Sequence, residues 1–182
     1  LKVAGSTQVA RWVRQREIDL GFTGVPVNNE GIHCVPWLKD QLVLIVPPSH
    51  KWANLAHGLD VAELKNETMI LREQGSGTRR SLEKKLEEKN IEMNKIPCVM
   101  ELGSTRAVIT AVEAGLGVSI VSRYAVQDAL ELGKVVEVPL VGLDLARYLY
   151  LLRHPQGPGG FAVEAFGEFV SDKDNCKRFL RQ

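Results

Sequence analysis

Short apolar runs alternate with amphipathic segments along nearly the whole chain. The apolar runs predict strands over 1–5, 19–24, 40–48, 67–73, 95–102, 118–122, 135–140 and 147–154. The amphipathic segments predict helices over 8–18, 60–66, 78–90, 104–115, 123–133 and 161–170. Strands separated by helices of about ten residues are typical of parallel sheets with helical crossovers. The pattern therefore predicts an α/β fold.

The composition argues against several classes of function. The 182 residues include 25% charged side chains with a net charge of +1, without the basic excess of a nucleic-acid-binding domain. No apolar run approaches the roughly 18 residues of a membrane span. Three widely spaced cysteines argue against a disulfide framework and a zinc site, and they fit a reducing cytoplasm. The chain begins "LKVAG", without an initiator Met, so we expect a piece of a longer protein.

Three turns combine glycine with serine or threonine after predicted strands, and the second and third of them open predicted helices. They are Gly5-Ser6-Thr7, Gly75-Ser76-Gly77-Thr78 and Gly103-Ser104-Thr105. Glycine lets the backbone approach a ligand, and the free N–H groups of a helix start attract anions. Any one turn could be a simple helix cap, but three in one chain favour a pocket for a small anion. The second turn lacks the lysine of a nucleotide-binding P-loop, which excludes that motif.

Two arginines follow the second turn, where a helix already carries partial positive charge. Arg79 and Arg80 oppose the helix dipole unless an anion binds there. The alternative is that both are solvated and pair with Glu83, which lies one turn further along. The four histidines have no ligand spacing, and no nucleophile–base pair is visible. We therefore expect binding chemistry, with no catalytic residue, no metal and no cofactor.

Four segments in this order carry a family resemblance. They are "EIDLGFTG", "DQLVLIVPPSHKWAN", "LREQGSGTRRSLE" and "ELGSTRAVITAVEAGLGVSIVSRYAV". Together they resemble the effector-binding domain of LysR-type transcriptional regulators over nearly the whole chain. The turn "REQGSGTR" is most similar to the branch associated with sulfur and cysteine metabolism.

The resemblance implies a type 2 periplasmic-binding-protein fold with two α/β subdomains. It places crossing strands near Val46 and Leu145, which gives a first subdomain of 1–45 and 146–182 and a second of 46–145. A small anionic effector is then expected in the cleft between them. The predicted effector-binding residues are Ser6, Thr7, Thr23, Gly75, Ser76, Gly77, Thr78, Arg79, Ser104 and Thr105.

The same resemblance implies partners. Regulators of this family form homodimers through the regulatory domain and tetramers at full length, and they bind DNA through an N-terminal winged helix-turn-helix that this chain lacks. Val108, Ile109 and Val112 on one helix, and an apolar stripe on 8–18, are candidates for the dimer surface. The alternative is that both stripes face their own sheets. We expect no membrane partner.

One departure from the family lies between Thr7 and Gln8. The family has a helix and a strand of about thirty residues before the "D-x-G" strand, whereas here Thr7 runs almost directly into "QVARWVRQREIDLG". Either those residues are deleted or the chain omits a segment. We favour omission, because loss of a central strand and its helix would expose core.

Two other functions share this fold. An extracytoplasmic solute-binding protein would be a monomer, so dimerisation separates it from a regulator. An enzyme such as a prephenate dehydratase would carry a Thr-Arg-Phe motif. Neither Thr78-Arg79-Arg80 nor Thr105-Arg106-Ala107 matches that motif. A regulator that controls transcription, and not an enzyme, is therefore expected.

Overall fold

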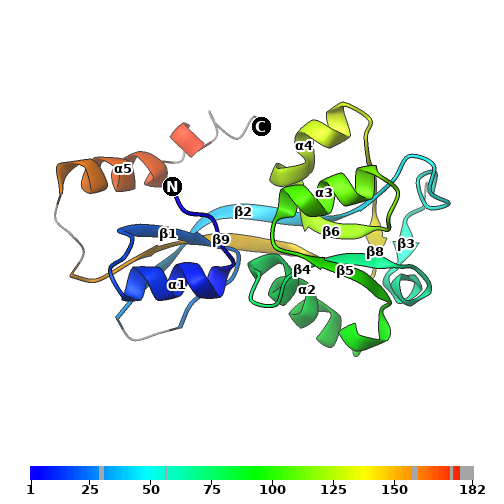
Figure 1. The fold of residues 1–182 in the computed structure, drawn as a ribbon, viewed down its shortest axis with the longest axis horizontal. Helices are drawn as coiled ribbons and strands as arrows, with labels where there is room; N and C mark the ends of the chain where they lie inside the picture. Colours follow the sequence, from blue (N-terminus) through cyan, green and yellow to red (C-terminus); the bar gives the residue numbers. More distant parts are fainter. Residues whose placement is uncertain (29–30, 56, 157–159, 173, 177–182) are drawn as a thin grey trace. The chain divides into compact units, whose positions relative to one another are not determined.

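The structure is a computed structural model that describes residues 1–28, 31–55, 57–156, 160–172 and 174–176. The chain divides into two compact units (Figure 1). Unit 1 consists of Leu1–Lys39 and Tyr148–Gln182, and unit 2 is Asp40–Arg147. The chain passes between them at Lys39–Asp40 and at Arg147–Tyr148. The family resemblance places these crossings near Val46 and Leu145. The first passage lies earlier because Leu42–Ile45 already pair with a strand of unit 2.

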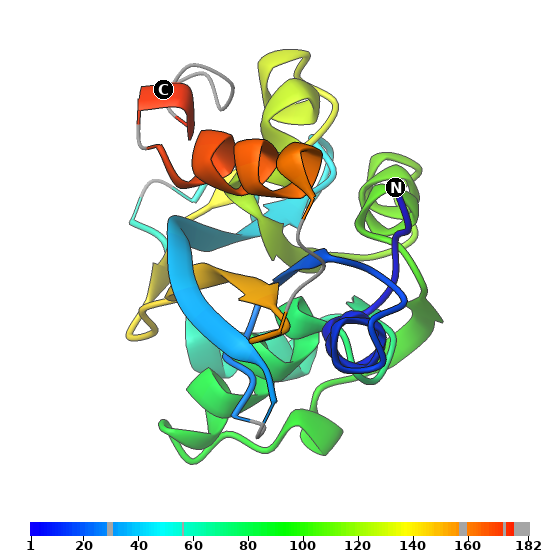
Figure 2. The same ribbon diagram turned by 90° about the vertical axis from the view of Figure 1, so that its left-hand side faces the viewer.

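Unit 1 is a small antiparallel sheet with one helix on each face (Figure 2). Its elements are α1 (Ser6–Arg14), β1 (Leu20–Thr23), the first part of β2 (His33–Val46), most of β9 (Ala146–Arg153) and α5 (Phe161–Ser171). β9 lies between β1 and β2. α1 buries Val9, Ala10 and Val13 in a cluster with Leu152 of β9. The predicted helix over 8–18 therefore packs its apolar stripe on its own sheet.

The predicted first strand does not form. Leu1–Gly5 lies outside every strand, and the side chains of Leu1 and Val3 are exposed. α1 begins at once at Ser6 and includes Thr7 and Gln8 in its first turn. A strand needs a neighbour to satisfy its backbone groups, and Leu1–Gly5 has none among the described residues.

Unit 2 contains the remaining elements in strand–helix alternation. They are β3 (Leu59–Asp60), η1 (Val61–Asn66), β4 (Met69–Arg72), α2 (Gly77–Glu87), η2 (Met93–Lys95), β5 (Cys98–Leu102), α3 (Thr105–Glu113), β6 (Ser119–Ser122), α4 (Arg123–Glu131), β7 (Val136–Val138) and β8 (Leu140–Val141). β4 pairs with β5, and β3 with β8, in parallel. β2 pairs with β6 and β7 antiparallel. The α/β class is confirmed, and the expected parallel pairing is found for β4–β5 and β3–β8 but not for the pairs that β2 makes.

The two faces of β2 belong to two different cores, which explains its continuous apolar run. Leu42, Leu44 and Val46 lie in a cluster with α2. Val43 and Ile45 lie in a cluster with α3 and α4. Side chains alternate between the faces of a strand, so a strand covered on both faces has no polar positions.

The apolar face of α3 is also buried inside unit 2. Val108, Ile109 and Val112 are at most 1% exposed and lie in the second cluster. The alternative that this stripe faces its own sheet therefore describes the structure, and these three side chains are not available to a dimer surface. Among the described residues, no helix combines the length and apolarity needed to cross a membrane.

Candidate functional site

The start of α2 is a helix end without a side-chain cap. Ser76 occupies the N-cap position, but its side chain makes no capping hydrogen bond. Ser76, Gly77 and Thr78 are all buried. Gly75 has φ of +89°, a conformation that favours glycine and that turns the chain from β4 into the helix. The first N–H groups of α2 are thus left for another partner.

A buried arginine lies against this helix start. Arg147, the second residue of β9, donates from Nη2 to the Thr78 Oγ1 at 3.4 Å and from Nε to the Asp40 Oδ2 at 2.8 Å. Its side chain is 10% exposed. The Nη1 group is buried and has no hydrogen-bond partner among the described residues. Leaving such a donor unsatisfied is costly, so this atom marks a place where an acceptor would be favourable.

Asp40 fixes the orientation of this arginine. Its Oδ1 accepts a hydrogen bond from the Ser122 Oγ at 2.7 Å, and the side chain has no exposed surface. Burial lowers the pKa of Arg147, and the charge and hydrogen bond of Asp40 oppose that shift. The ion pair therefore keeps a cation in a buried position beside the start of α2.

Arg79 is already engaged by two carboxylates. Its Nε donates to the Glu83 Oε1 at 2.8 Å, and its Nη1 lies 2.5 Å from the Glu101 Oε1 and 3.2 Å from the carbonyl oxygen of Arg72. Burial lowers the pKa of Arg79, but hydrogen bonds to Glu101 and Glu83 raise it overall. Arg79 thus pairs with Glu83 as the alternative expected, but its side chain is only 11% exposed and is not solvated.

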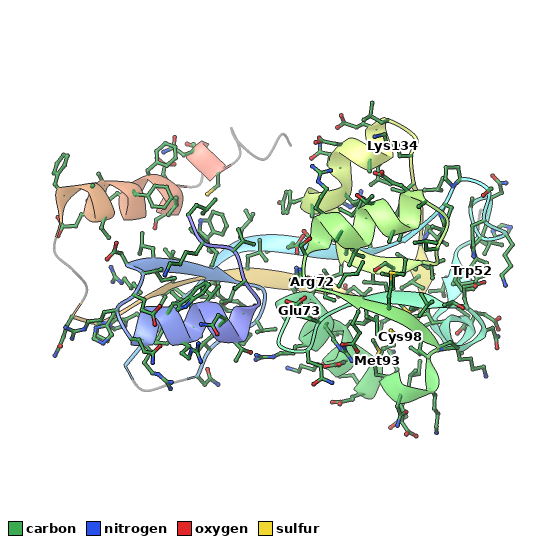
Figure 3. All side chains as sticks on the ribbon, in the orientation of Figure 1. Trp52, Arg72, Glu73, Met93, Cys98 and Lys134 are labelled. Carbon is green, nitrogen blue, oxygen red and sulfur yellow. The ribbon has the colours of Figure 1, made fainter. Side chains whose placement is uncertain are left out.

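The third turn has structural partners too. Ser104 caps α3, since its Oγ accepts a hydrogen bond from the Ala107 N–H at 3.1 Å. Thr105 Oγ1 accepts from the Arg72 Nη1 at 2.6 Å. Arg72 also pairs with Glu73, its neighbour in Figure 3, through a 2.8 Å contact from Nε. The arginine links the end of β4 to the start of α3.

In unit 1 the predicted hydroxyls make contacts within the unit. Ser6 Oγ accepts a hydrogen bond from the Gly24 N–H at 3.2 Å. Thr23 Oγ1 donates to the carbonyl oxygen of Val25 at 2.9 Å. Thr7 is exposed on the first turn of α1. These contacts place Ser6 and Thr23 at the junction of α1 with the loop that follows β1.

Sequence reasoning missed the two residues that give unit 2 its buried charge. Asp40 and Arg147 lie 107 residues apart, and each was assigned only to a predicted strand. The available signal was a single charge at the edge of an apolar run, "DQLVLIV" and "RYLYLL". Among the described residues, no group of three or more His, Cys, Asp or Glu side chains could hold a metal ion.

Two α/β units joined by two strand passages are typical of the type 2 periplasmic-binding-protein-like fold. The match to the family model "LysR substrate binding domain" covers residues 1–175, and the chain belongs to this family. It is a LysR-type effector-binding domain.

Curated relatives are named as transcriptional regulators. An HTH-type regulator of Methanocaldococcus jannaschii is 45% identical over 73% of the chain and 45% of its own length. The regulator YeiE of Escherichia coli K12 is 35% identical over 98% of the chain and 59% of its own length. The chain thus spans about half the length of these relatives.

Solved structures show the same fold. The regulatory domain of Synechocystis CcmR in complex with 2-PG has a TM-score of 0.80 at 22% identity, with 94% of this chain and 80% of that chain covered. The effector-binding domain of QuiR in complex with shikimate has a TM-score of 0.81 at 20% identity, with 96% and 80% covered.

Proposed function

We propose that this chain senses a small anionic effector at the start of α2 and thereby controls transcription by a longer regulator. The observation that carries the proposal is the buried Arg147 Nη1, which lacks a partner beside an uncapped helix start. A carboxylate or phosphate oxygen would satisfy that donor. The same anion would accept hydrogen bonds from the free N–H groups of Gly77 and Thr78.

The electrostatics favour an anion over a neutral ligand. The α2 N-terminus carries partial positive charge. Asp40 pairs with Arg147, but the carboxylate contacts Nε and leaves the Nη1 donor of the guanidinium without a partner among the described residues. Two structural relatives were solved with 2-PG and with shikimate, and shikimate is a carboxylate. This proposal makes Ser76, Gly77, Thr78 and Arg147 the central residues.

The other predicted residues are assigned supporting roles. Ser104 and Thr105 hold α3 and Arg72 in place, and Arg79 holds α2 against β5 through Glu101. A contribution of Ser6, Thr7 and Thr23 to the same effector site stays a prediction, as does membership of the sulfur and cysteine branch. We further propose that the full-length protein is a cytoplasmic homodimer that binds DNA through a separate winged helix-turn-helix and has no enzymatic activity.

Calorimetry with matched variants tests the site. The chain is titrated with a panel of small carboxylates and phosphorylated acids, and the tightest ligand is then measured on each variant. Thr78→Val removes a donor while it preserves volume and is expected to weaken binding about five- to tenfold. Glu88→Gln serves as the control, because Glu88 is an exposed residue beyond the far end of α2 and its substitution is expected to leave affinity unchanged. Equal affinities for wild type and Thr78→Val would overturn the placement at α2.

Two further measurements on this chain separate a regulator from an enzyme and from a solute-binding protein. An activity screen on the same panel is expected to show no turnover. Sedimentation of the chain at tens of micromolar is expected to show a dimer. Only monomer would favour a solute-binding protein over a regulator.

A further inference from the structure

Unit 1 contains a cavity that none of the predicted effector residues lines. It has a volume of about 590 Å³ and lies between α5 and the β1–β9–β2 sheet. Its apolar lining comes from Leu20, Val35, Leu151 and Val163. The volume falls within the range of small-molecule pockets, about 300–1,000 Å³.

The register of the sheet explains which side chains face this cavity. Leu20 pairs with Arg153 and Gly21 pairs with Leu152. Leu152 packs under α1 on one face, so Leu20 and Arg153, one position away, face α5 on the other. The two faces of one short sheet thus differ: an apolar core lies under α1 and a cavity with charged walls lies under α5.

α5 is held at one end and leaves room along its length. The Trp37 Nε1 donates a hydrogen bond to the carbonyl oxygen of Val170, and the Trp37 ring lies 4.5 Å from that of Phe22. Gly167 lines the cavity one turn before this anchor and contributes no side chain. The helix is therefore fixed over the sheet without its middle turn filling the space.

The α5 wall is acidic, whereas the sheet wall combines a cationic and an acidic side chain. The α5 wall presents Glu164 and Glu168, which are four residues apart on one helix face and repel each other. The sheet wall presents Arg153 and His33, together with the carboxylate of Asp19. Among the described residues, the side chains of these five groups make no ion pair or hydrogen bond with protein. Charges of both signs around the cavity are thus available to a ligand.

We propose that this cavity binds a free amino acid with an aliphatic side chain. Its ammonium group would lie between Glu164 and Glu168 and relieve their repulsion. Its carboxylate would meet Arg153, and its aliphatic side chain would pack on Leu151 and Val163. The lining has three carboxylates, Asp19, Glu164 and Glu168, and one arginine, Arg153, so a ligand with a cationic ammonium group is electrostatically favoured. This site is independent of the anion site at α2, which lies in the other unit.

Three compounds that share an isobutyl side chain test this proposal on the full chain. They are L-leucine, 3-methylbutylamine, which lacks the carboxylate, and 4-methylpentanoate, which lacks the amine. Calorimetry is expected to show binding of L-leucine and about tenfold or weaker binding of each analogue, since each loses one charge-assisted contact. An equal or tighter affinity for the amine would overturn the zwitterion assignment in favour of a cation site. Absence of L-leucine binding at millimolar concentration would remove the site altogether.

Variants locate the binding. Glu168→Gln and Arg153→Gln are expected to weaken L-leucine binding about tenfold, and circular dichroism checks that these exposed changes leave the fold intact. Glu88→Gln, which changes an exposed carboxylate at the C-cap of α2, is the matched control. Thr78→Val separates the two sites, since it is expected to weaken the anionic effector and to leave L-leucine unchanged. Unchanged affinity in both cavity variants would refute the placement under α5.

Discussion

The buried ion pair of unit 2 predicts an unusually large cost for a nearly isosteric substitution. Asp40→Asn keeps the shape of the side chain and an acceptor for Ser122, but it removes the charge opposite Arg147. Arg147 is 10% exposed and cannot move to water without disturbing β9. Removing one partner of a buried pair typically costs about 3–5 kcal/mol, because the other charge stays buried and uncompensated.

This loss of stability can be measured as a shift in the midpoint urea concentration of unfolding. With a slope of about 2.5 kcal/mol per M, the midpoint of unit 2 is expected to fall by about 1–2 M. Trp52 is buried in unit 2, whereas Trp12 and Trp37 lie in unit 1. A Trp12→Phe/Trp37→Phe background therefore makes tryptophan fluorescence report on unit 2 alone.

An exposed pair in the same unit is the control. Glu88 contacts Lys85 at 3.2 Å, and its side chain is 49% exposed. Glu88→Gln is expected to cost less than about 1 kcal/mol. Adding Arg147→Met to Asp40→Asn should recover much of the loss, because the orphaned charge is then gone. If Asp40→Asn costs no more than Glu88→Gln, the reasoning from burial is refuted.

Three further changes probe local features by chemical unfolding. Ser104→Ala removes the cap of α3 and is expected to cost about 1 kcal/mol. Gly117→Ala is expected to cost about 1–3 kcal/mol, because φ is +155° and an added Cβ would lie 2.7 Å from the carbonyl oxygen of Thr68. Burial raises the pKa of Glu67, but its hydrogen bond to Lys51 and further contacts lower it below its ordinary value of 4.5. The carboxylate therefore stabilises the fold above about pH 4.5, and this stabilisation is lost as the pH falls through the folded-state pKa. In Glu67→Gln the free energy of unfolding is expected to fall less steeply with decreasing pH than in the wild type.

Local patterns predicted the elements of unit 2 well because each signal lies within one segment. Ser104 as the cap of α3 and the strand "VSIVS" both follow from a few adjacent residues. Pro47 ends β2 because proline cannot donate to a sheet. The strand predicted over Leu1–Gly5 does not form because a strand depends on a partner elsewhere in the chain. The apolar composition of the segment itself does not provide that partner.

The candidate site was predictable only in part for the same reason. The turn Gly75–Thr78 is a contiguous motif and was visible. Whether a serine in such a turn caps its helix or is left for a ligand depends on the fold around it. Here Ser104 caps its helix, whereas Ser76 makes no capping hydrogen bond. The pairing of Arg79 with Glu83 was foreseen as an alternative, but Glu101 comes from a different strand. No sequence pattern joins Asp40 to Arg147.

The discontinuous course of unit 1 imposes an order on its formation during synthesis. Unit 2 is one uninterrupted stretch, so all its contacts become possible once Arg147 has left the ribosome. The sheet of unit 1 must wait longer, because β1 has no partner until β9 emerges and Leu20 can meet Arg153. During that interval the apolar side of α1 lacks Leu152. The early-made half of the smaller unit is therefore the last to fold, and it is the part of a nascent chain that a chaperone would have to shield.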